Sequence, residues 1–371
     1  MRNTNNKEFM MGNEIVTRAA LAAGAEVMFG YPITPTTEIL ESWIALSAVN
    51  HKKYLQTEDE MSAGFALIGA CLAGKKAFTA TAGPGNILMQ DAFAMAEALR
   101  IPTVAIIQQR GGQSTSTVIY SQEEVTLTTK GGNGEGFRIV YSTAGLQDLY
   151  DYTIKAFDVA WRYRFPSFVL GDGYQGKMKG EVELRKPGKL TDAQPILLSK
   201  NRSADYYFPY YNKFTKTCLP NASFEGSVNF RNCLNMEEET RDIIESYAYD
   251  FEKYASEIEE FEIYRADDAE ALIISHGIVS AASKVAIDRL RDKGFKIGLF
   301  RPITLSPFPK KDLNLLLKRV KSAAVIESAL GQLYSLVKND IDDESHCPIK
   351  KYYYPGIGIT PEEIEHIWSN K

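Results

Sequence analysis

The chain has 371 residues, of which 44% are hydrophobic and 24% charged, with a formal net charge of −5 at pH 7. This length accommodates two or three domains, and these fractions are those of ordinary globular proteins. The small negative charge disfavours a nucleic-acid surface, and the absence of an apolar run of about 18 residues predicts no membrane span.

Residues 12–170 alternate between helix-like and strand-like segments. Short apolar runs predict buried strands, and small-residue stretches with a helical period, bounded by glycine or proline, predict helices. We expect helices at residues 14–23, 36–48, 61–73, 87–99 and 150–163, and strands at residues 26–30, 76–80, 103–108 and 167–170. This alternation predicts a largely parallel sheet with helices on both faces.

The alternation of helix-like and strand-like segments stops after the last of these strands. Residues 174–235 show no sustained period, and residues 237–263 have the pattern of a charged amphipathic helix, broken at most once. A second alternating stretch then predicts strands at residues 271–275, 296–301 and 323–327, and helices at residues 279–293, 311–319 and 331–341. We therefore predict an α/β protein with two doubly wound domains, at residues 1–172 and 266–371, joined by an irregular connection and helix at residues 173–265.

Four loops of the first domain are rich in groups that bind ligands, and we place all four at strand ends. They span residues 30–37, 56–61, 83–86 and 109–112. In open α/β sheets, ligands bind outside the carboxyl ends of the strands, so one pocket is able to collect all four loops.

Each loop has a physical reason to bind a ligand. Thr34 follows a rigid Pro-Ile turn near a helix start, where a carboxylate binds well. Glu60 opens a helix with small neighbours, which lets a flat ring lie close to the backbone. The Gly-Pro-Gly turn at residues 83–85 has no bulk, and Arg110, followed by two glycines, is suited to grip a carboxylate in bidentate fashion.

Each feature also has an ordinary explanation. By itself, Thr34 is better explained as a helix cap, and Glu60 as a first-turn acid stabilised by the helix dipole. The glycines at residues 83–85 alone indicate only a turn, and Arg110 alone suggests a surface ion pair. Their joint placement at strand ends is what favours a ligand site.

The motifs GYPITPTTE, QTEDEMSAGFALIGA, TATAGPGNILM and QQRGGQSTS, in this order, resemble the α subunit of 2-oxoacid:ferredoxin oxidoreductases, of the 2-oxoglutarate synthase type. The likeness resumes near the C-terminus with SHG, LFRPITLSPFP and ESALGQL. That family uses thiamine diphosphate to decarboxylate a 2-oxoacid, reduces ferredoxin through iron–sulfur clusters and forms an acyl-CoA. The resemblance implies a transketolase-like domain that binds the thiamine pyrimidine, followed by a transketolase C-terminal-like domain.

The resemblance also implies roles for single residues. Glu60 would be the catalytic acid that hydrogen-bonds N1′ of the aminopyrimidine, with Glu58 as a competing candidate, and its pKa should be raised by burial. Thr34 and Arg110 would bind the substrate's 1-carboxylate. The residues expected to wall the cofactor are Tyr31, Pro32, Ile33, Gly83, Pro84, Gly85 and Asn86.

Three positions depart from the family pattern and bear on the substrate. Gln113 and Ser116 stand where relatives usually have Pro and Gly, and Asn133 stands where many 2-oxoglutarate-type relatives have His. We favour 2-oxoglutarate, with branched-chain 2-oxoacids or pyruvate as alternatives. Residues 113–120 are the candidates for the pocket of the distal group.

Neither a metal nor an iron–sulfur cluster is expected on this chain. The four cysteines, Cys71, Cys218, Cys233 and Cys347, form no C-x-x-C pair and have no zinc-type spacing to histidine. The [4Fe–4S] clusters are therefore expected on partner subunits. So few thiols, with no apolar signal stretch at the start, also predict a cytoplasmic protein.

Gly171-Asp172-Gly173 followed by Asn201 has the form of a diphosphate–Mg²⁺ motif. The intervening residues contain Pro187 and Pro195 and lack the helix that such a motif needs. We therefore expect no diphosphate site here, and the resemblance implies that the Mg²⁺ and diphosphate site lies on a β subunit, across an interface from this chain, in a complex that also includes a γ subunit.

Two other functions remain open at the level of sequence. One is the pyrimidine-binding chain of a lipoate-linked 2-oxoacid dehydrogenase. The other is a non-catalytic scaffold, which has no need of either Glu60 or Arg110.

Overall fold

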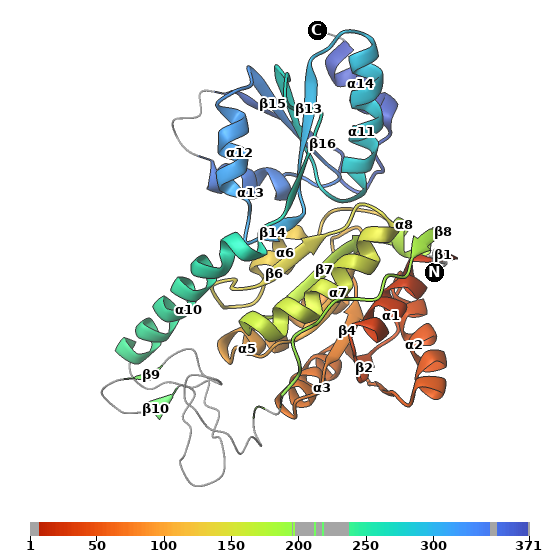
Figure 1. Ribbon diagram of the computed structural model, residues 1–371, viewed down its shortest axis with the longest axis vertical. Helices are drawn as coiled ribbons and strands as arrows, with labels where there is room; N and C mark the ends of the chain where they lie inside the picture. Colours follow the sequence, from red (N-terminus) through yellow and green to blue (C-terminus); the bar gives the residue numbers. More distant parts are fainter. Residues whose placement is uncertain are drawn as a thin grey trace.

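The computed structural model describes residues 7–194, 196, 211–212, 217–218, 237–341 and 347–369. Two sheets lie one above the other along the long axis, each flanked by helices (Figure 1). This arrangement confirms the predicted α/β class with two doubly wound units. The exact domain limits at residues 172 and 265 stay a prediction.

The larger sheet has seven strands in the order β14-β6-β7-β5-β4-β2-β3. All neighbours are parallel except β14, which runs antiparallel to β6. The strands are β2 (Val27–Gly30), β3 (Lys53–Gln56), β4 (Ala77–Thr81), β5 (Val104–Gln109), β6 (Ile139–Ser142), β7 (Ser167–Asp172) and β14 (Thr304–Ser306).

Two groups of helices cover this sheet. One face carries α1 (Gly12–Ala22), α2 (Thr37–Asn50) and α7 (Leu146–Tyr163), and the other carries α3 (Glu60–Leu72), α4 (Pro84–Leu88), α5 (Gln90–Ala98) and α6 (Val125–Lys130). Successive strand residues point to opposite faces, so Ile106 packs on the α1–α7 side while Ala105 and Ile107 pack on the other. Both faces are buried along the inner strands, as is usual for a parallel sheet, whereas the edge strand β3 is exposed.

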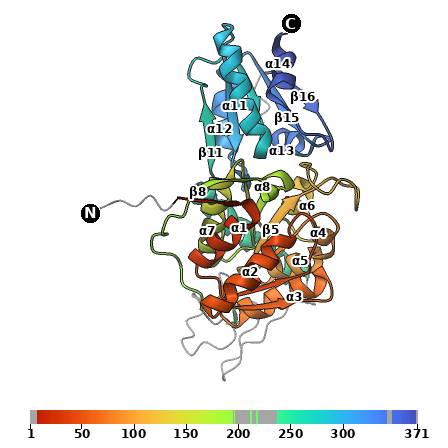
Figure 2. The same ribbon diagram turned by 90° about the vertical axis from the view of Figure 1, so that its right-hand side faces the viewer.

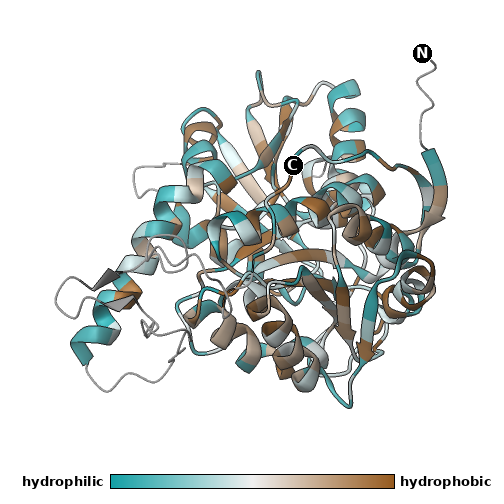
Figure 3. Ribbon diagram, turned by 60° about the horizontal axis from the view of Figure 1, so that its bottom comes forward, coloured by the Kyte–Doolittle hydropathy of each residue, from teal (hydrophilic) through white to brown (hydrophobic). Residues whose placement is uncertain are grey.

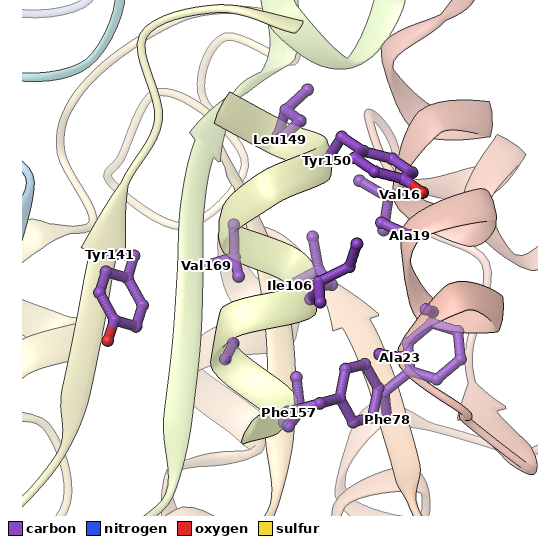
Figure 4. Close-up of a cluster of buried hydrophobic side chains, with 14 of the residues drawn as sticks. Val16, Ala19, Ala23, Phe78, Ile106, Tyr141, Leu149, Tyr150, Phe157 and Val169 are labelled. Atoms are coloured by element: carbon purple, nitrogen blue, oxygen red, sulfur yellow. The ribbon is translucent and has the colours of Figure 1, made fainter. Parts of the chain in front are cut away.

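The main core lies between α1, α7 and the sheet, where labelled side chains from all three converge (Figure 4). Phe78 of β4 stands at its centre, with its ring centroid 4.9 Å from Trp43 and 6.0 Å from Phe157, both edge-on. Val16 and Ala19 of α1 lie beside Tyr150 of α7 in the same core, where their small side chains let the two helices approach closely (Figure 4). Colouring by hydropathy places apolar residues mainly in the strands and the helix faces turned toward them (Figure 3).

The smaller sheet has the order β11-β13-β12-β15-β16, with only β11 antiparallel to its neighbour. Its strands are β11 (Phe261–Tyr264), β12 (Ala271–Ile274), β13 (Ile297–Pro302), β15 (Ser322–Glu327) and β16 (Ile349–Tyr353). Its helices are α11 (Gly277–Asp292), α12 (Lys310–Leu317), α13 (Gln332–Asp340) and α14 (Pro361–Ser369). α11 and α14 pack on one face and α12 and α13 on the other.

Buried polar contacts join the two units. The Gln122 amide donates to the carbonyl of His276 at 2.9 Å and accepts from the backbone N–H of Ser328 at 3.0 Å. Arg301 reaches the carbonyl of Ser142 at 3.3 Å, and β14 extends the larger sheet. All three C-terminal segments that carried the family resemblance thus contact the first unit, where α6 and α13 lie next to each other (Figure 2).

The remaining elements frame the larger unit. β1 (Lys7–Met11) pairs antiparallel with β8 (Lys179–Glu183), and α8 (Gly173–Lys177) precedes β8. A short antiparallel pair is formed by β9 (Tyr211–Asn212) and β10 (Thr217–Cys218). α10 (Glu237–Ile258) packs beside the larger sheet, where the Tyr247 hydroxyl donates to the carbonyl of Ala98 at 3.0 Å. Among the described residues, no helix combines the length and apolar character needed to cross a bilayer.

Several predicted elements needed correction. The helix expected at residues 237–263 ends at Ile258, because the following residues pair with β13 as β11. The helix expected at residues 87–99 is two helices, α4 and α5, and begins three residues earlier, at Pro84. β3 and β6 were not predicted; every residue of β3 is exposed, so it lacks the pattern of a buried strand.

Replacing Phe78 with Ala should lower the free energy of unfolding by about 3–5 kcal/mol, because it removes a fully buried ring and leaves a cavity between α2, α7 and the sheet. The control Phe9→Ala removes a ring that is 71% exposed and should change stability by less than about 0.5 kcal/mol. Chemical denaturation of both variants measures the difference. Equal effects of the two changes would contradict this description of the core.

Candidate functional site

The four predicted loops meet at one edge of the larger sheet. They follow β2, β3, β4 and β5, which are adjacent parallel strands in the order β5-β4-β2-β3. Carboxyl ends of parallel strands share an edge, so the loops converge although they are far apart in the sequence. The expected placement of the loops is confirmed, and contacts between them define the site.

Glu60 is the first residue of α3 and is only 5% exposed. The preceding Asp59 caps the helix by accepting from the Ser62 backbone N–H at 2.7 Å, which directs the next side chain inward. Burial raises the pKa of Glu60, the neighbouring Asp59 charge adds to this rise, and the Arg110 charge opposes it. Glu58, the competing candidate, is exposed on the loop. The buried acid of this loop is therefore Glu60.

The turn at residues 83–85 packs directly on the two charged side chains. A Cβ at Gly85 would lie 2.6 Å from Glu60 Oε1, and a Cβ at Gly83 would lie 2.6 Å from Arg110 Nε. Gly83 also has φ of +52°, a conformation that side chains disfavour. Glycine is therefore required at both positions by contact, and at Gly83 by backbone conformation as well.

Arg110 and Thr34 lie together. The Arg110 Nη1 donates to the Thr34 carbonyl at 2.8 Å, while its Nε is buried and has no hydrogen-bond partner among the described residues. Arg110 is 3% exposed, so the surface ion pair considered from the sequence is wrong.

The helix-cap explanation for Thr34 is also wrong. α2 begins at Thr37, and Thr36 occupies the N-cap position, with its Oγ1 donating to the Ile33 carbonyl at 2.9 Å. Thr34 is exposed. Its hydroxyl is therefore not committed to the helix start and is accessible beside Arg110.

The other residues expected near the cofactor fall into two groups. Tyr31 is 39% exposed, and Pro32 and Ile33 are partly buried on the same loop. Asn86, by contrast, is fully buried, and its amide donates to Glu124 Oε2 at 3.0 Å and to Thr128 Oγ1 at 3.2 Å. The Asn86 side chain therefore faces the protein interior.

Glu124 is a part of the site that the sequence did not reveal. Its carboxylate is buried and accepts from the backbone N–H of Gly83 at 2.8 Å and that of Arg110 at 3.1 Å, in addition to Asn86. Burial raises the pKa of Glu124, and these donors oppose the rise. The sequence signal was weak, because a glutamate ahead of a short helix also fits an ordinary first-turn acid.

A cavity of about 750 Å³ opens beside Arg110. Residues of both units line it, including the loop that departs from the family pattern. The lining comprises Gly83, Ile87, Arg110, Gly112, Gln113, Ser114, Thr115, Ser116, Glu123, Glu124, Leu127, Leu330, Gln332 and Pro355. Residues 113–116 of the predicted distal-group segment thus line the space next to the predicted carboxylate-binding arginine.

The Gly171-Asp172-Gly173 segment has a structural role. Asp172 is fully buried, and its Oδ1 accepts from the Gln175 backbone N–H at 3.0 Å to cap α8. Gly173 packs against the Ile119 carbonyl with no room for a side chain. Asn201, the other end of the motif, lies outside the described residues, as does Cys233. Within the described residues, no group of three or more His, Cys, Asp or Glu is placed to hold a metal ion.

Two families match most of the chain. Residues 18–253 match the family described as "Pyruvate flavodoxin/ferredoxin oxidoreductase, thiamine diP-bdg", and residues 269–365 match "Pyruvate:ferredoxin oxidoreductase core domain II". Among curated proteins, 2-oxoglutarate synthase subunit KorA of Methanocaldococcus jannaschii is 34% identical over 88% of this chain and 90% of its own length. Ketoisovalerate oxidoreductase subunit VorB of Methanothermobacter marburgensis is 30% identical over 92% of this chain and 90% of its own length.

Solved structures support the fold. A 2-oxoglutarate:ferredoxin oxidoreductase from Magnetococcus marinus, with 2-oxoglutarate, coenzyme A and succinyl-CoA bound, superposes with a TM-score of 0.85 at 22% identity. The match covers 100% of this chain and 66% of that one. A split-gene transketolase superposes with a TM-score of 0.55 at 12% identity, and the match covers 96% of this chain and 93% of that one. The transketolase-like architecture expected from the sequence is confirmed.

Stability should depend on pH through Asp172. Burial raises the pKa of Asp172 from 3.8 to about 7, so the folded state holds a proton that the unfolded state has released. The unfolding free energy should therefore fall as pH rises between these values, by at most about 1.4 kcal/mol per pH unit. Asp172→Asn should lack this decline, so its stability relative to wild type should rise over the same window. Denaturation at several pH values tests this, with the exposed Glu181→Gln as control, and parallel curves for wild type and Asp172→Asn would refute it.

A methyl group should be rejected at Gly85 but accepted at Gly69. Gly85→Ala places its Cβ against Thr81 Oγ1 and Glu60 and should destabilise the protein by about 1–3 kcal/mol. Gly69→Ala, on the open side of α3 with nothing within 4 Å, should stabilise it by about 0.5–1 kcal/mol. Urea denaturation of the isolated chain compares the two. Tolerance of Ala at position 85 would show that the turn does not pack on Glu60 as described.

Proposed function

The chain belongs to the 2-oxoacid:ferredoxin oxidoreductase family as an alpha subunit, and we propose that it supplies the pyrimidine half of a thiamine diphosphate site together with the carboxylate-binding half of a 2-oxoacid site. It is one subunit of an oxidoreductase that needs partner subunits. The observation that carries the assignment of residues is the packing of the Gly83–Gly85 turn on both Glu60 and Arg110.

The residues at the sheet edge fit a thiamine ring. Gly83 and Gly85 let the turn lie directly against Arg110 and Glu60, and Tyr31, Pro32 and Ile33 offer an apolar wall from the neighbouring strand end. Thiamine diphosphate, when bound, supplies the nucleophilic carbon and the electron sink for decarboxylation. We propose that Asn86 supports the turn at residues 83–86 from behind, because its amide is hydrogen-bonded to Glu124 and Thr128 inside the protein.

Glu60 is the group that exchanges a proton with the ring nitrogen in this proposal. The raised pKa of Glu60 favours its protonated form relative to an exposed carboxyl, which suits a group that shares a proton with a basic nitrogen. Its position in the first turn of α3 fixes the side chain, since Asp59 holds the helix start. The Arg110 charge opposes the rise in the pKa of Glu60.

Arg110 and Thr34 bind the substrate's 1-carboxylate in this proposal. The unpartnered Nε–H of Arg110 is a buried donor, and a buried donor left without an acceptor costs about 1–3 kcal/mol. A carboxylate would satisfy it with a charge-assisted hydrogen bond. The Nη1 contact to the Thr34 carbonyl holds the guanidinium plane in place while the Thr34 hydroxyl remains accessible.

Partner subunits complete the site in this proposal. The described residues contain no metal-binding cluster, so a β subunit would bring the Mg²⁺–diphosphate half and a [4Fe–4S] cluster, with a γ subunit in the same complex. Large apolar side chains stand exposed around Glu60, as at a surface awaiting a partner. They are Tyr31, Met61, Phe65, Ile87 and Leu88. The few thiols and a ferredoxin acceptor favour the cytoplasm.

We propose 2-oxoglutarate as the substrate, with coenzyme A as acyl acceptor and ferredoxin as electron acceptor. The 34% identical relative, a 2-oxoglutarate synthase subunit, supports this choice. A branched-chain 2-oxoacid is the second candidate, because a ketoisovalerate oxidoreductase subunit is 30% identical over a slightly larger share of the chain.

The test is anaerobic reconstitution of the chain with the partner subunits that co-purify from its host. The complex should reduce ferredoxin only when coenzyme A and a 2-oxoacid are both present, and 2-oxoglutarate, 3-methyl-2-oxobutanoate and pyruvate are compared. Glu60→Gln should lower kcat by roughly 100-fold or more, because proton exchange with the ring nitrogen is lost.

Glu58→Gln is the matched control, since it removes an exposed carboxylate from the same loop, and it should leave kcat unchanged. A complex that reduces ferredoxin with none of the three acids would refute the proposed function. Loss of activity in Glu58→Gln but not in Glu60→Gln would refute the assignment of the acid.

A further inference from the structure

One buried carboxylate connects the turn proposed to face the cofactor with the arginine proposed to bind the substrate. Glu124 Oε1 accepts from the backbone N–H of Gly83 and from that of Arg110, and Oε2 accepts from Asn86 Nδ2. Gly83 and Asn86 belong to the turn proposed to face the cofactor, and Arg110 is proposed to bind the substrate. The same side chain therefore holds both ligand-facing loops by hydrogen bonds.

The orientation of the Asn86 amide is fixed from its other side. Gln90 Nε2 donates to Asn86 Oδ1 at 2.8 Å, so the Asn86 Nδ2 must face Glu124. Only an acceptor is compatible with that position. A carboxylate at residue 124 satisfies all three donors at once, whereas an amide there would set two NH₂ groups against each other.

Position 124 also controls how close the two loops come. The Gly83 backbone touches the Arg110 side chain, so a small movement of either loop changes the place of the guanidinium. Glu124 is the N-cap residue of α6 and is only 4% exposed, so water has little access to replace a lost hydrogen bond. Loss of a hydrogen bond here would be taken up by movement of the loops.

We propose that Glu124 is a positioning residue that sets the separation between the cofactor-facing turn and the substrate-binding Arg110. It acts through its hydrogen bonds to Gly83, Asn86 and Arg110. The inference rests on the proposed function, because it assumes that the turn and the arginine serve two parts of one reaction. It adds a residue whose loss should alter substrate affinity as well as rate.

The Glu124–Asn86 pair allows a polarity-swap experiment. Glu124→Gln opposes two NH₂ groups, and Asn86→Asp opposes two carboxylates. The double variant Glu124→Gln/Asn86→Asp restores one donor facing one acceptor and keeps the total charge. The amide oxygen introduced at position 124 is then free to accept from Gly83 and Arg110. Thr128 Oγ1, now a donor, is able to turn toward the new carboxylate.

Each single variant should raise the KM for the 2-oxoacid and lower kcat/KM by roughly 10-fold or more, since a charge-assisted hydrogen bond is lost. The double variant should recover most of that loss. All complexes are measured with kcat and KM normalised to assembled complex, together with the thermal midpoint of each chain. Asp158→Asn is the matched control, because that carboxylate also accepts from a backbone N–H, of Thr191 at 2.7 Å, but lies on α7 away from the site. It should leave KM unchanged.

The outcomes separate positioning from mere stability. A Glu124→Gln complex with wild-type KM and normalised kcat overturns the proposal, even when its thermal midpoint falls. A double variant no better than either single variant also overturns it. Should Glu124→Gln fail to assemble, the double variant must assemble and regain activity, or the role is only in folding and the proposal fails. An inactive wild-type complex overturns the proposed function itself, whereas an active wild type with either of the preceding results overturns only the role of Glu124.

Discussion

The parallel pairing of β5, β4, β2 and β3 is the constraint on which the site depends. It sends four chain segments out of the sheet at the same edge, and each enters a helix or turn whose first residues face the others. β5 and β4 are short and buried on both faces, so core packing on Phe78 and its neighbours fixes where these strands end, and β2 and the exposed edge strand β3 are held by parallel pairing beside them. The chemistry at the edge is therefore positioned by apolar contacts made well below it.

Three ionisable side chains are buried at this edge: Glu60, Arg110 and Glu124. Burying charge is costly, and replacing buried charged groups with apolar residues often stabilises a protein. Here the cost is only partly offset within the chain, because Arg110 Nε has no partner among the described residues and the pKa of Glu60 is raised. A scaffold would gain stability by losing these groups. Their retention with unsatisfied hydrogen-bonding capacity fits an enzyme whose ligands complete the set.

The second unit contributes residues to the cavity beside Arg110 and holds one of its loops. Gln332 accepts from the Thr126 backbone N–H and donates to the Glu123 carbonyl, so α13 holds the loop that precedes α6. Leu330 and Pro355 line the cavity beside Arg110. Both matched families are ferredoxin oxidoreductases, which sets aside the lipoate-linked dehydrogenase considered from the sequence.

The sequence by itself determined the α/β class, most of the helices and strands of both units, and the placement of four ligand-type loops at strand ends. These follow from hydrophobic period and turn chemistry, which act between residues close in the chain. Only the tertiary structure decided that residues after Ile258 form β11, that Thr34 caps no helix, that Asp172 is a buried cap and that Glu124 joins two loops. In β11 the deciding hydrogen bonds go to β13, and Glu124 finds its donors 41 and 14 residues away. The spacing of neighbouring residues does not predict such pairings, because the partners meet only when the chain has folded and the strand ends lie together.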